Sequence, residues 1–160
     1  MKPIDVLFLC ETNAATSLMA EAIVNHRGDA RVRAFSAGRT PGDTLLPEAR
    51  DVLAARAIAT EGLVPKAWPI FALPGARRPD IIVDLATVTW TIPELKQLAE
   101  QSVLRWPLRD AALVESRRDR RSVAQAVFDA LESRILDELV PLVARLALVP
   151  MRPHGVELTA

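Results

Sequence analysis

The chain is predicted to be one α/β domain with a four-stranded parallel sheet and helices on both faces. Three observations predict this fold class: strand-like apolar runs alternate with helical periodicity, half of the residues are hydrophobic, and a length of 160 residues suits a single domain. Strands that alternate with helices favour parallel pairing, because each connecting helix packs back onto the sheet.

The first elements follow directly from the hydrophobic pattern. The run Val6-Leu7-Phe8-Leu9 predicts a buried strand over residues 4–9, and the apolar spacing after it predicts a helix over residues 17–27. The same criteria give the remaining order, which is a strand at 31–36, a helix at about 47–57, a strand at 80–85, a helix at 93–101 and a strand at 103–107.

The carboxyl-terminal part is predicted to be one more helix. Ser122 and Gln125 form a capping-box pattern, so the helix is expected to begin near Ser122, after a solvated charged run at residues 117–121. Pro141 is expected to kink or end it. Its apolar stripe consists of Val123, Val127, Leu131, Ile135 and Leu139.

The domain is expected to span residues 1–150. Within it, residues 63–78 contain three prolines and are predicted to be mainly loop. Residues 151–160 are predicted to be a disordered tail. No internal repeat or second domain is indicated.

The composition argues against several classes of partner and site. Twenty acidic residues balance twenty basic ones, so no net charge attracts nucleic acid or an anionic membrane. The apolar runs are too short for a signal-peptide core or a membrane span, which predicts a cytoplasmic protein. With Cys10 as the single cysteine and only His26 and His154 as histidines, we expect no intrachain disulfide and no metal site.

The motif that carries chemistry lies between the first predicted strand and the first predicted helix. Cys10 ends the strand, and the residues after it open the helix. Backbone N–H groups at a helix start favour an anion and lower the pKa of a nearby thiol. We therefore predict a nucleophilic Cys10 beside an anion-binding loop. The predicted anion-binding residues are Glu11, Thr12, Asn13, Ala14, Ala15, Thr16 and Ser17.

Other candidate residues are expected at the same edge of the sheet. The Ser36-Ala37-Gly38 turn and Asp110 each follow a predicted strand, as Cys10 does. In open parallel sheets, ligands bind outside the carboxyl ends of the strands. The three segments are therefore predicted to lie close together.

The octet from Cys10 to Ser17 resembles the signature loop of the low-molecular-weight protein tyrosine phosphatases and the arsenate reductases that share their fold. Cys10, Asn13 and Ser17 match the nucleophile, the bracing asparagine and the thiolate-bonding hydroxyl of that loop. Thr16 stands where the family has an arginine that grips the oxyanion. The resemblance covers most of residues 4–148, and Phe35-Ser36-Ala37-Gly38 is similar to the arsenate-reductase branch in particular.

The resemblance implies a mechanism. The Cys10 thiolate attacks phosphorus or arsenic, Asp110 protonates the leaving oxygen, and water or a second thiol resolves the covalent intermediate. It also implies no bound cofactor, although arsenate reduction by a chain with one cysteine would need an external thiol. Thr16 is expected to attenuate turnover, since a hydroxyl cannot replace a bidentate guanidinium. Arg39 and Arg109 are candidate replacements by their positions.

The function predicted first is therefore that of a cysteine-thiolate enzyme. Its expected partner is a small tetrahedral oxyanion or a phosphomonoester, and the chain is expected to be a monomer or a weak dimer. Two alternatives stay open: a noncatalytic relative that binds an anion or a partner, and a redox-responsive thiol protein whose cysteine forms a mixed disulfide.

Each candidate residue also has an interpretation without chemistry. A cysteine that ends a buried strand is commonly a small core residue. Asp110 reads equally well as a loop aspartate. Thr16 and Ser17 are candidate N-caps of the first helix, and for Thr16 capping is the favoured interpretation.

Overall fold

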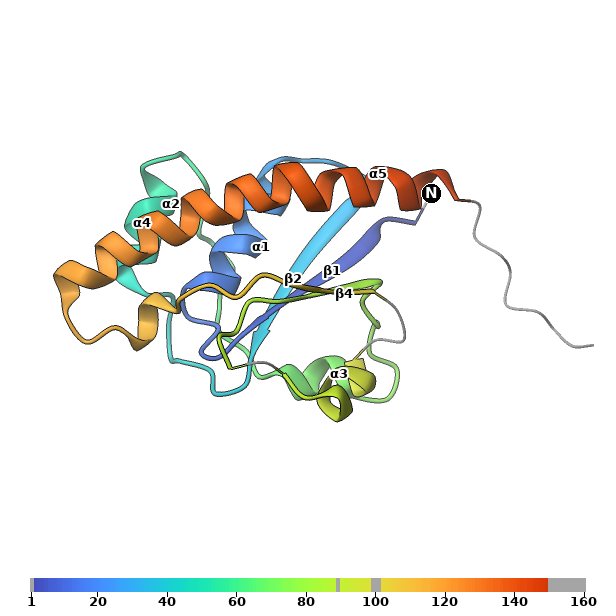
Figure 1. The fold of residues 1–160 in the computed structure, drawn as a ribbon, viewed down its shortest axis with the longest axis horizontal. Coiled ribbons are helices and arrows are strands. Elements are labelled where there is room, and N and C mark those ends of the chain that lie inside the picture. The colour runs from blue at the N-terminus through green and yellow to red at the C-terminus, as the bar shows by residue number, and fades with distance from the viewer. Residues whose placement is uncertain (1, 89, 99–101, 150–160) are drawn as a thin grey trace, which may run out of the picture.

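A computed structural model describes residues 2–88, 90–98 and 102–149 and shows a single-domain α/β fold (Figure 1). The predicted tail at 151–160 lies outside the described residues. The strands are β1 (Ile4–Cys10), β2 (Val32–Gly38), β3 (Ile81–Asp84) and β4 (Ser102–Arg105). The helices are α1 (Thr16–His26), α2 (Pro47–Ala54), α3 (Ile92–Leu98), α4 (Arg117–Arg134) and α5 (Val140–Leu148). Two short 3₁₀ helices are labelled η1 (Trp68–Ala72) and η2 (Ala111–Leu113), and a π-helical turn is labelled η3 (Ile135–Leu139).

The four strands form one parallel sheet in the order β2-β1-β3-β4, which confirms the predicted fold class. Cys10 at the end of β1 pairs with Gly38, and Leu9 pairs with Asp84 at the end of β3. The carboxyl ends of β1, β2 and β3 therefore meet at one edge of the sheet. The predicted Ser36-Ala37-Gly38 turn is instead the last part of β2.

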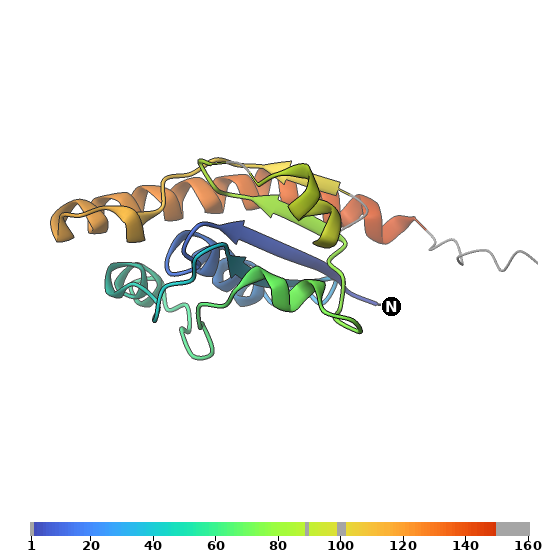
Figure 2. The same ribbon diagram turned by 90° about the horizontal axis from the view of Figure 1, so that it is seen from below.

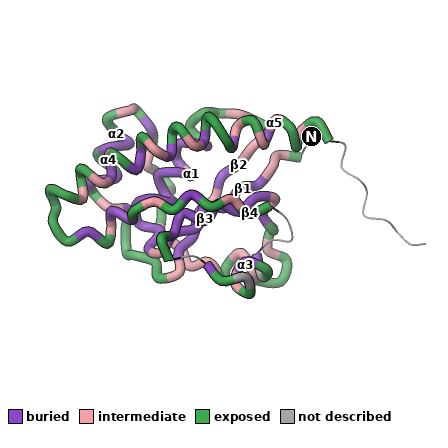
Figure 3. The backbone as a smooth tube through the Cα atoms, viewed as in Figure 1, coloured by how far each residue is buried: buried purple, intermediate pink, exposed green. Residues whose placement is uncertain are grey.

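The two faces of the sheet carry separate hydrophobic clusters, because side chains alternate along each strand. Val6 and Phe8 of β1 point into the larger cluster, which α1 and α4 cover, whereas Leu7 and Leu9 point into a smaller cluster with residues of η1 and α3. Figure 1 shows α4 and α5 on one side of the sheet and α3 on the other, and Figure 2 views the sheet from the α3 side. Figure 3 shows buried positions concentrated along the central strands.

The start of α4 differs from the prediction. The helix begins at Arg117, and its N-cap is Ser116, whose hydroxyl accepts a hydrogen bond from the N–H of Asp119 at 3.4 Å. The expected start near Ser122 was wrong, because the exposed charged run forms the first helical turn and Ser116 caps it. Asp119 in that turn also interacts favourably with the helix dipole.

Pro141 neither ends nor visibly kinks the long carboxyl-terminal helix. A π-helical turn, η3, follows α4, and Pro141 lies in the first turn of α5. The ribbon runs from α4 to α5 as one long helix (Figure 1). A π-helical turn shifts the hydrogen-bond partners by one residue, and a proline needs no N–H donor in a first helical turn. The helix therefore continues across the sheet to Leu148.

No helix among the described residues is long and apolar enough to cross a bilayer. Those residues also contain no group of three or more His, Cys, Asp or Glu side chains arranged to hold a metal ion.

Candidate functional site

The loop between β1 and α1 is held from outside by the segment that follows β2. Four backbone carbonyls of the loop accept hydrogen bonds from backbone N–H groups of that segment. The donor and acceptor residues are Arg39 and Cys10 (3.3 Å), Thr40 and Glu11 (2.8 Å), Gly42 and Thr12 (2.8 Å), and Leu46 and Ala14 (2.7 Å). On the inner side, the N–H groups of Thr12, Asn13 and Ala14 donate to Asp110 Oδ2, Cys10 Sγ and the Thr12 hydroxyl. Asn13 has a φ of 46°, a left-handed conformation that asparagine tolerates well.

Cys10 lies at the centre of this loop. Its sulfur accepts a hydrogen bond from the Asn13 N–H at 3.2 Å and lies 2.9 Å from the Ser17 hydroxyl. The Asn13 side-chain amide donates to the same hydroxyl at 2.7 Å. All three side chains are 1% exposed or less. The structure therefore gathers the cysteine, the asparagine and the serine of the motif around one sulfur at the amino end of α1.

The pKa of the Cys10 thiol moves opposite to the sequence-based expectation. Burial, first, and then the nearby negative charge of Asp110 raise this pKa from 9.0 to about 11. Hydrogen bonds from Ser17 and Asn13 lower it, but by less than burial and Asp110 together raise it. The predicted lowering of the pKa was wrong, because the sequence shows the helix start but not the desolvation of the sulfur.

The raised pKa predicts how stability depends on pH. Between pH 9 and about 11 the folded state keeps the thiol proton, whereas the unfolded chain loses it. The free energy of unfolding should therefore fall with rising pH in this window, by about 1 kcal/mol per pH unit more than in the Cys10→Ser variant. Urea denaturation of both proteins across the window measures this difference. Parallel pH profiles would contradict the assignment. In Asp110→Asn the fall should still begin near pH 9 but end at a lower pH, because the thiol pKa of the folded protein is raised less without this charge.

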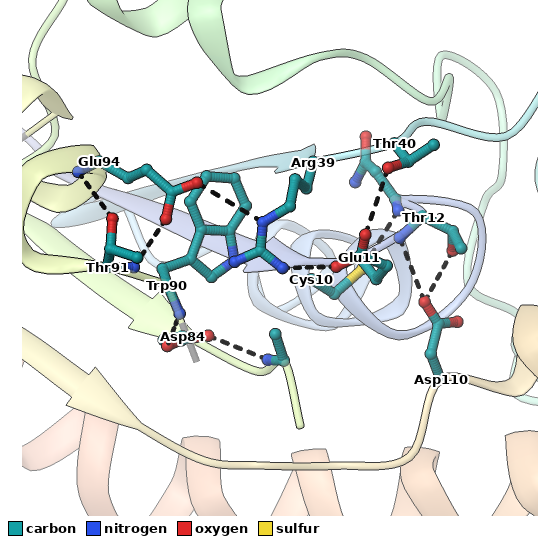
Figure 4. A network of polar contacts seen from close by, with 12 residues as sticks. Cys10, Glu11, Thr12, Arg39, Thr40, Asp84, Trp90, Thr91, Glu94 and Asp110 are labelled. Atoms are coloured by element: carbon teal, nitrogen blue, oxygen red, sulfur yellow. Dashed lines mark hydrogen bonds and ion pairs between the residues drawn. The ribbon is translucent and has the colours of Figure 1, made fainter. Parts of the chain in front are cut away.

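Asp110 approaches the loop at Thr12 (Figure 4). Its Oδ2 accepts hydrogen bonds from the N–H and the hydroxyl of Thr12 at 3.2 and 2.8 Å, and its Oδ1 accepts one from the Ala112 N–H at 3.1 Å. The carboxylate is thus fixed, although Ala111 rather than proline follows it. An internal carboxylate also occupies one of the N–H groups that an external anion would use.

Thr16 begins α1 and is fully buried. Its hydroxyl donates to the backbone carbonyl of Arg109 at 3.2 Å. The N-cap of α1 is Ala15, which offers no side-chain cap, so the interpretation of Thr16 as a cap was wrong. The Thr16 hydroxyl connects the loop to the Asp110 segment instead.

Arg39 and Arg109 were the candidates to replace the arginine that the loop lacks, and they contact the loop in different ways. The Arg39 guanidinium contacts the Glu11 carboxylate at 2.6 Å and that of Glu94 at 3.6 Å, and it stacks 4.6 Å from the centre of the Trp90 ring (Figure 4). Arg109 is exposed and touches the loop through its backbone carbonyl. Arg39 therefore reaches the loop, but its charge is neutralised by two carboxylates.

A small pocket of about 70 Å³ opens above the sulfur. That volume holds about two water molecules, so a tetrahedral anion would fill it. Apart from Cys10, Glu11 and Asp110, the residues that line this pocket are mostly apolar. The wall residues are Leu85, Ala86, Thr87, Val88, Leu108 and Leu113.

Asp84 was not predicted as a site residue, and it shapes one wall of this pocket. Its buried carboxylate accepts hydrogen bonds from the N–H groups of Ala86 and Trp90 at 3.0 and 3.2 Å and pairs with Arg105 at 3.0 Å. These bonds fold the turn after β3 over the loop. An aspartate at the end of an apolar strand, Pro79-Asp80-Ile81-Ile82-Val83-Asp84, was the signal that could have indicated it.

A chain of contacts through Lys66, Glu21 and Ser36 supports Asn13. The backbone N–H of Lys66 donates to the Asn13 side-chain carbonyl at 2.9 Å. The Lys66 ammonium pairs with Glu21 at 3.7 Å, and Glu21 in turn accepts a hydrogen bond from the buried Ser36 hydroxyl. Burial raises the pKa of Glu21 above its ordinary value. The loop is thus connected to β2 and to the segment before η1.

Gly38 is expected to be essential for loop geometry. A Cβ at this position would lie 2.9 Å from three atoms, which are the Asn13 Cβ, the Asn13 nitrogen and the Glu11 carbonyl oxygen. Backbone atoms cannot move aside as a flexible side chain can, so Gly38→Ala should destabilise the protein by about 1–3 kcal/mol. Gly42→Ala is the matched control, with a nearest contact of 3.1 Å to Ala14 Cβ. In thermal unfolding, an equal or larger loss in Gly42→Ala would contradict this explanation.

Comparison with known proteins gives a family match and a set of similar folds. Residues 5–104 match the family described as low molecular weight phosphotyrosine protein phosphatase. A search of curated proteins found no match.

Three of the solved structures that resemble the chain are named as enzymes of different kinds. A thioredoxin-dependent arsenate reductase from Corynebacterium glutamicum is 22% identical, with a TM-score of 0.65, over 91% of this chain and 64% of that one. The YwlE arginine phosphatase from Geobacillus stearothermophilus is 18% identical, with a TM-score of 0.66, over 94% of this chain and 100% of the other. A low molecular weight protein tyrosine phosphatase from T. tengcongensis is 21% identical, with a TM-score of 0.63, over 87% and 99%. At these identities the likeness establishes the fold alone.

Proposed function

Because the chain belongs to the low-molecular-weight phosphotyrosine protein phosphatase family, we propose that it is a cysteine-dependent enzyme with slow turnover. Its substrate is a small tetrahedral oxyanion or a phosphomonoester. Cys10 is the nucleophile and Asp110 is the general acid.

The observation that carries this proposal is the set of groups around the Cys10 sulfur. The Asn13 N–H and the Ser17 hydroxyl lie within 3.2 and 2.9 Å of it and would stabilise a thiolate. Asp110 reaches the same loop through Thr12. A nucleophile, donors to its charged form and an acid therefore occur together at one end of the sheet.

The protonation state of Cys10 supports slow turnover at neutral pH. With its pKa raised to about 11, the thiol keeps its proton at neutral pH. Attack on phosphorus needs the thiolate. Only a small fraction of the protein therefore holds the reactive form of the sulfur at neutral pH.

The anion-binding side of the loop also supports slow turnover. Thr16 supplies a neutral hydroxyl that donates to the Arg109 carbonyl, and Arg39 is paired with Glu11 and Glu94. A catalytic arginine in phosphoryl transfer is typically worth about 10³- to 10⁵-fold in rate. Arsenate reduction by the same cysteine would also require an external thiol, because the chain has no other cysteine.

The test is activity that depends on Cys10. We expect the native chain to hydrolyse p-nitrophenyl phosphate, or to reduce arsenate with a small thiol present, slowly but above the buffer blank, and Cys10→Ser to lose this activity completely. Thermal unfolding of Cys10→Ser establishes that the variant is folded. Equal rates in the native chain and Cys10→Ser would overturn the proposal.

A second candidate function is noncatalytic binding of an anion or a partner. The contacts that favour it are those of Asp110 with Thr12, since an internal carboxylate already satisfies a loop N–H without any substrate. On this interpretation, titration calorimetry would show phosphate binding that Asp110→Asn strengthens, while neither protein shows turnover.

A further inference from the structure

A second and larger cavity lies at the opposite end of β1 from Cys10. Its volume is about 350 Å³, within the range of small-molecule binding sites. Its walls include Leu7 of β1, Phe35 of β2 and both Ile70 and Phe71 of η1. Asp5, which also lines it, precedes Cys10 by five residues on the same strand, which is about 16 Å. This cavity is therefore separate from the proposed active site.

The cavity contains one buried carboxylate, that of Asp5, which is 1% exposed. Asp5 shares a face of β1 with Leu7, because side chains alternate along the strand. Its Oδ1 accepts two hydrogen bonds from the Arg33 guanidinium, at 3.0 and 2.8 Å. Its Oδ2 has no hydrogen-bond donor among the described residues.

Arg77 forms a long ion pair with Asp5 Oδ2. Its Nε atom lies 3.5 Å from this oxygen without forming a hydrogen bond, and its side chain is 53% exposed. Asp5 and Arg77 both line the cavity, so this ion pair is part of the cavity wall. A buried charged oxygen without a donor is unfavourable, and a ligand that donates a hydrogen bond there would relieve this.

We propose that this cavity binds a small organic cation, with an aromatic or branched aliphatic body and one protonated amine. The body packs between Phe35, Phe71 and Ile70, and the ammonium donates to Asp5 Oδ2 in place of Arg77. The Phe35 and Phe71 rings meet edge to face with centroids 6.2 Å apart and supply aromatic surface for a cation. Arg77 turns outward into solvent, where half of its side chain already lies.

The charges around the cavity favour a cation over an anion. The Asp5 backbone N–H donates to a carboxylate oxygen of Asp80 at 2.8 Å, so a second negative side chain lies beside Asp5. Arg33 is already committed to Asp5 Oδ1. An anion would meet the Asp5 carboxylate in the cavity wall, where Arg77 is the one positively charged residue among the described lining residues.

Three probes of the same shape test the charge preference. Phenethylamine, 2-phenylethanol and phenylacetate are titrated into the isotope-labelled full chain, followed by amide NMR shifts. We expect saturable shifts with phenethylamine in the millimolar range, at Leu7, Phe35 and Ile70, and weaker binding of the alcohol and the acid. The proposal would be overturned if the alcohol or the acid bound as strongly as phenethylamine. It would also be overturned if the shifts were confined to the Cys10 loop or if no shift were saturable.

Two neighbouring arginines provide a matched pair of variants. Arg77→Ala removes the competitor for Asp5 Oδ2 and should strengthen phenethylamine binding about twofold to fivefold. Arg78→Ala removes an equal charge from an exposed residue beside it and should change nothing. Unchanged or weaker binding in Arg77→Ala would count against the proposed contact.

Two further variants test the location. Asp5→Asn should weaken phenethylamine binding about tenfold or more and leave 2-phenylethanol unaffected. Because Asp5 is buried and its loss could disturb folding, Ile70→Arg is the second variant. Ile70 is 45% exposed, so the change places bulk and positive charge in the cavity without altering the interior. Native-like binding in Ile70→Arg would exclude this cavity as the site.

Discussion

The Thr16→Arg variant is expected to hydrolyse p-nitrophenyl phosphate about 10²- to 10³-fold faster than the native chain. Thr16 is the first residue of α1, and its side chain lies between the Cys10 loop and the Arg109 carbonyl. A guanidinium there gives two charge-assisted hydrogen bonds to a tetrahedral anion. Its positive charge also opposes the effect of Asp110 and lowers the thiol pKa.

The control for this gain is Thr16→Lys. Lysine adds the same charge without the planar fork, so its gain should be smaller if bidentate binding matters. Rates at saturating substrate separate faster turnover from tighter binding. If both variants are folded and neither exceeds the native rate, the missing guanidinium is not what limits this site.

Asp84→Ala should destabilise the protein by about 2–4 kcal/mol. The carboxylate is 1% exposed and satisfies two backbone N–H groups as well as Arg105. Alanine leaves the N–H groups of Ala86 and Trp90 without their acceptor in the interior, which is more costly than losing a surface contact. The turn that forms one wall of the Cys10 pocket should loosen as a result. Urea denaturation measures the change.

Asp51→Ala is the matched control for Asp84. Asp51 also pairs with an arginine, Arg121 at 3.8 Å, but its side chain is 57% exposed. Removal of a surface ion pair of this kind should change stability by no more than about 0.5 kcal/mol. Similar losses in both variants would show that burial of Asp84 is not the cause.

Much of the fold could be predicted because its signals are local. The buried run of β1 and the helical spacing after it lie within one short stretch, and the alternation of such stretches determines parallel pairing. The start of α4 could not be chosen reliably, since Ser116 and Ser122 both offer a cap and only packing decides between them. Likewise, Pro141 predicts a helix end unless the turn before it widens.

The residues of the site could be predicted from the sequence, but the pKa of Cys10 and the pairing of Arg39 could not. Cys10, Ser17 and Asp110 come together because the ends of parallel strands meet at one edge. The thiol pKa depends on burial and on Asp110, and neither is visible in the motif. One of the two carboxylates that pair with Arg39 is likewise remote from the motif in sequence, since Glu94 comes from α3.

The π-helical turn η3 has a consequence for how the long helix tracks the sheet. The buried residues Leu131, Ile135, Leu139 and Val143 recur at every fourth position. In a regular α-helix that spacing drifts around the axis by about 40° at each step. A wider turn takes up more residues per revolution and so offsets part of the drift. Deleting one residue from this turn would rotate Val143 by about 100° and carry it out of the hydrophobic interior.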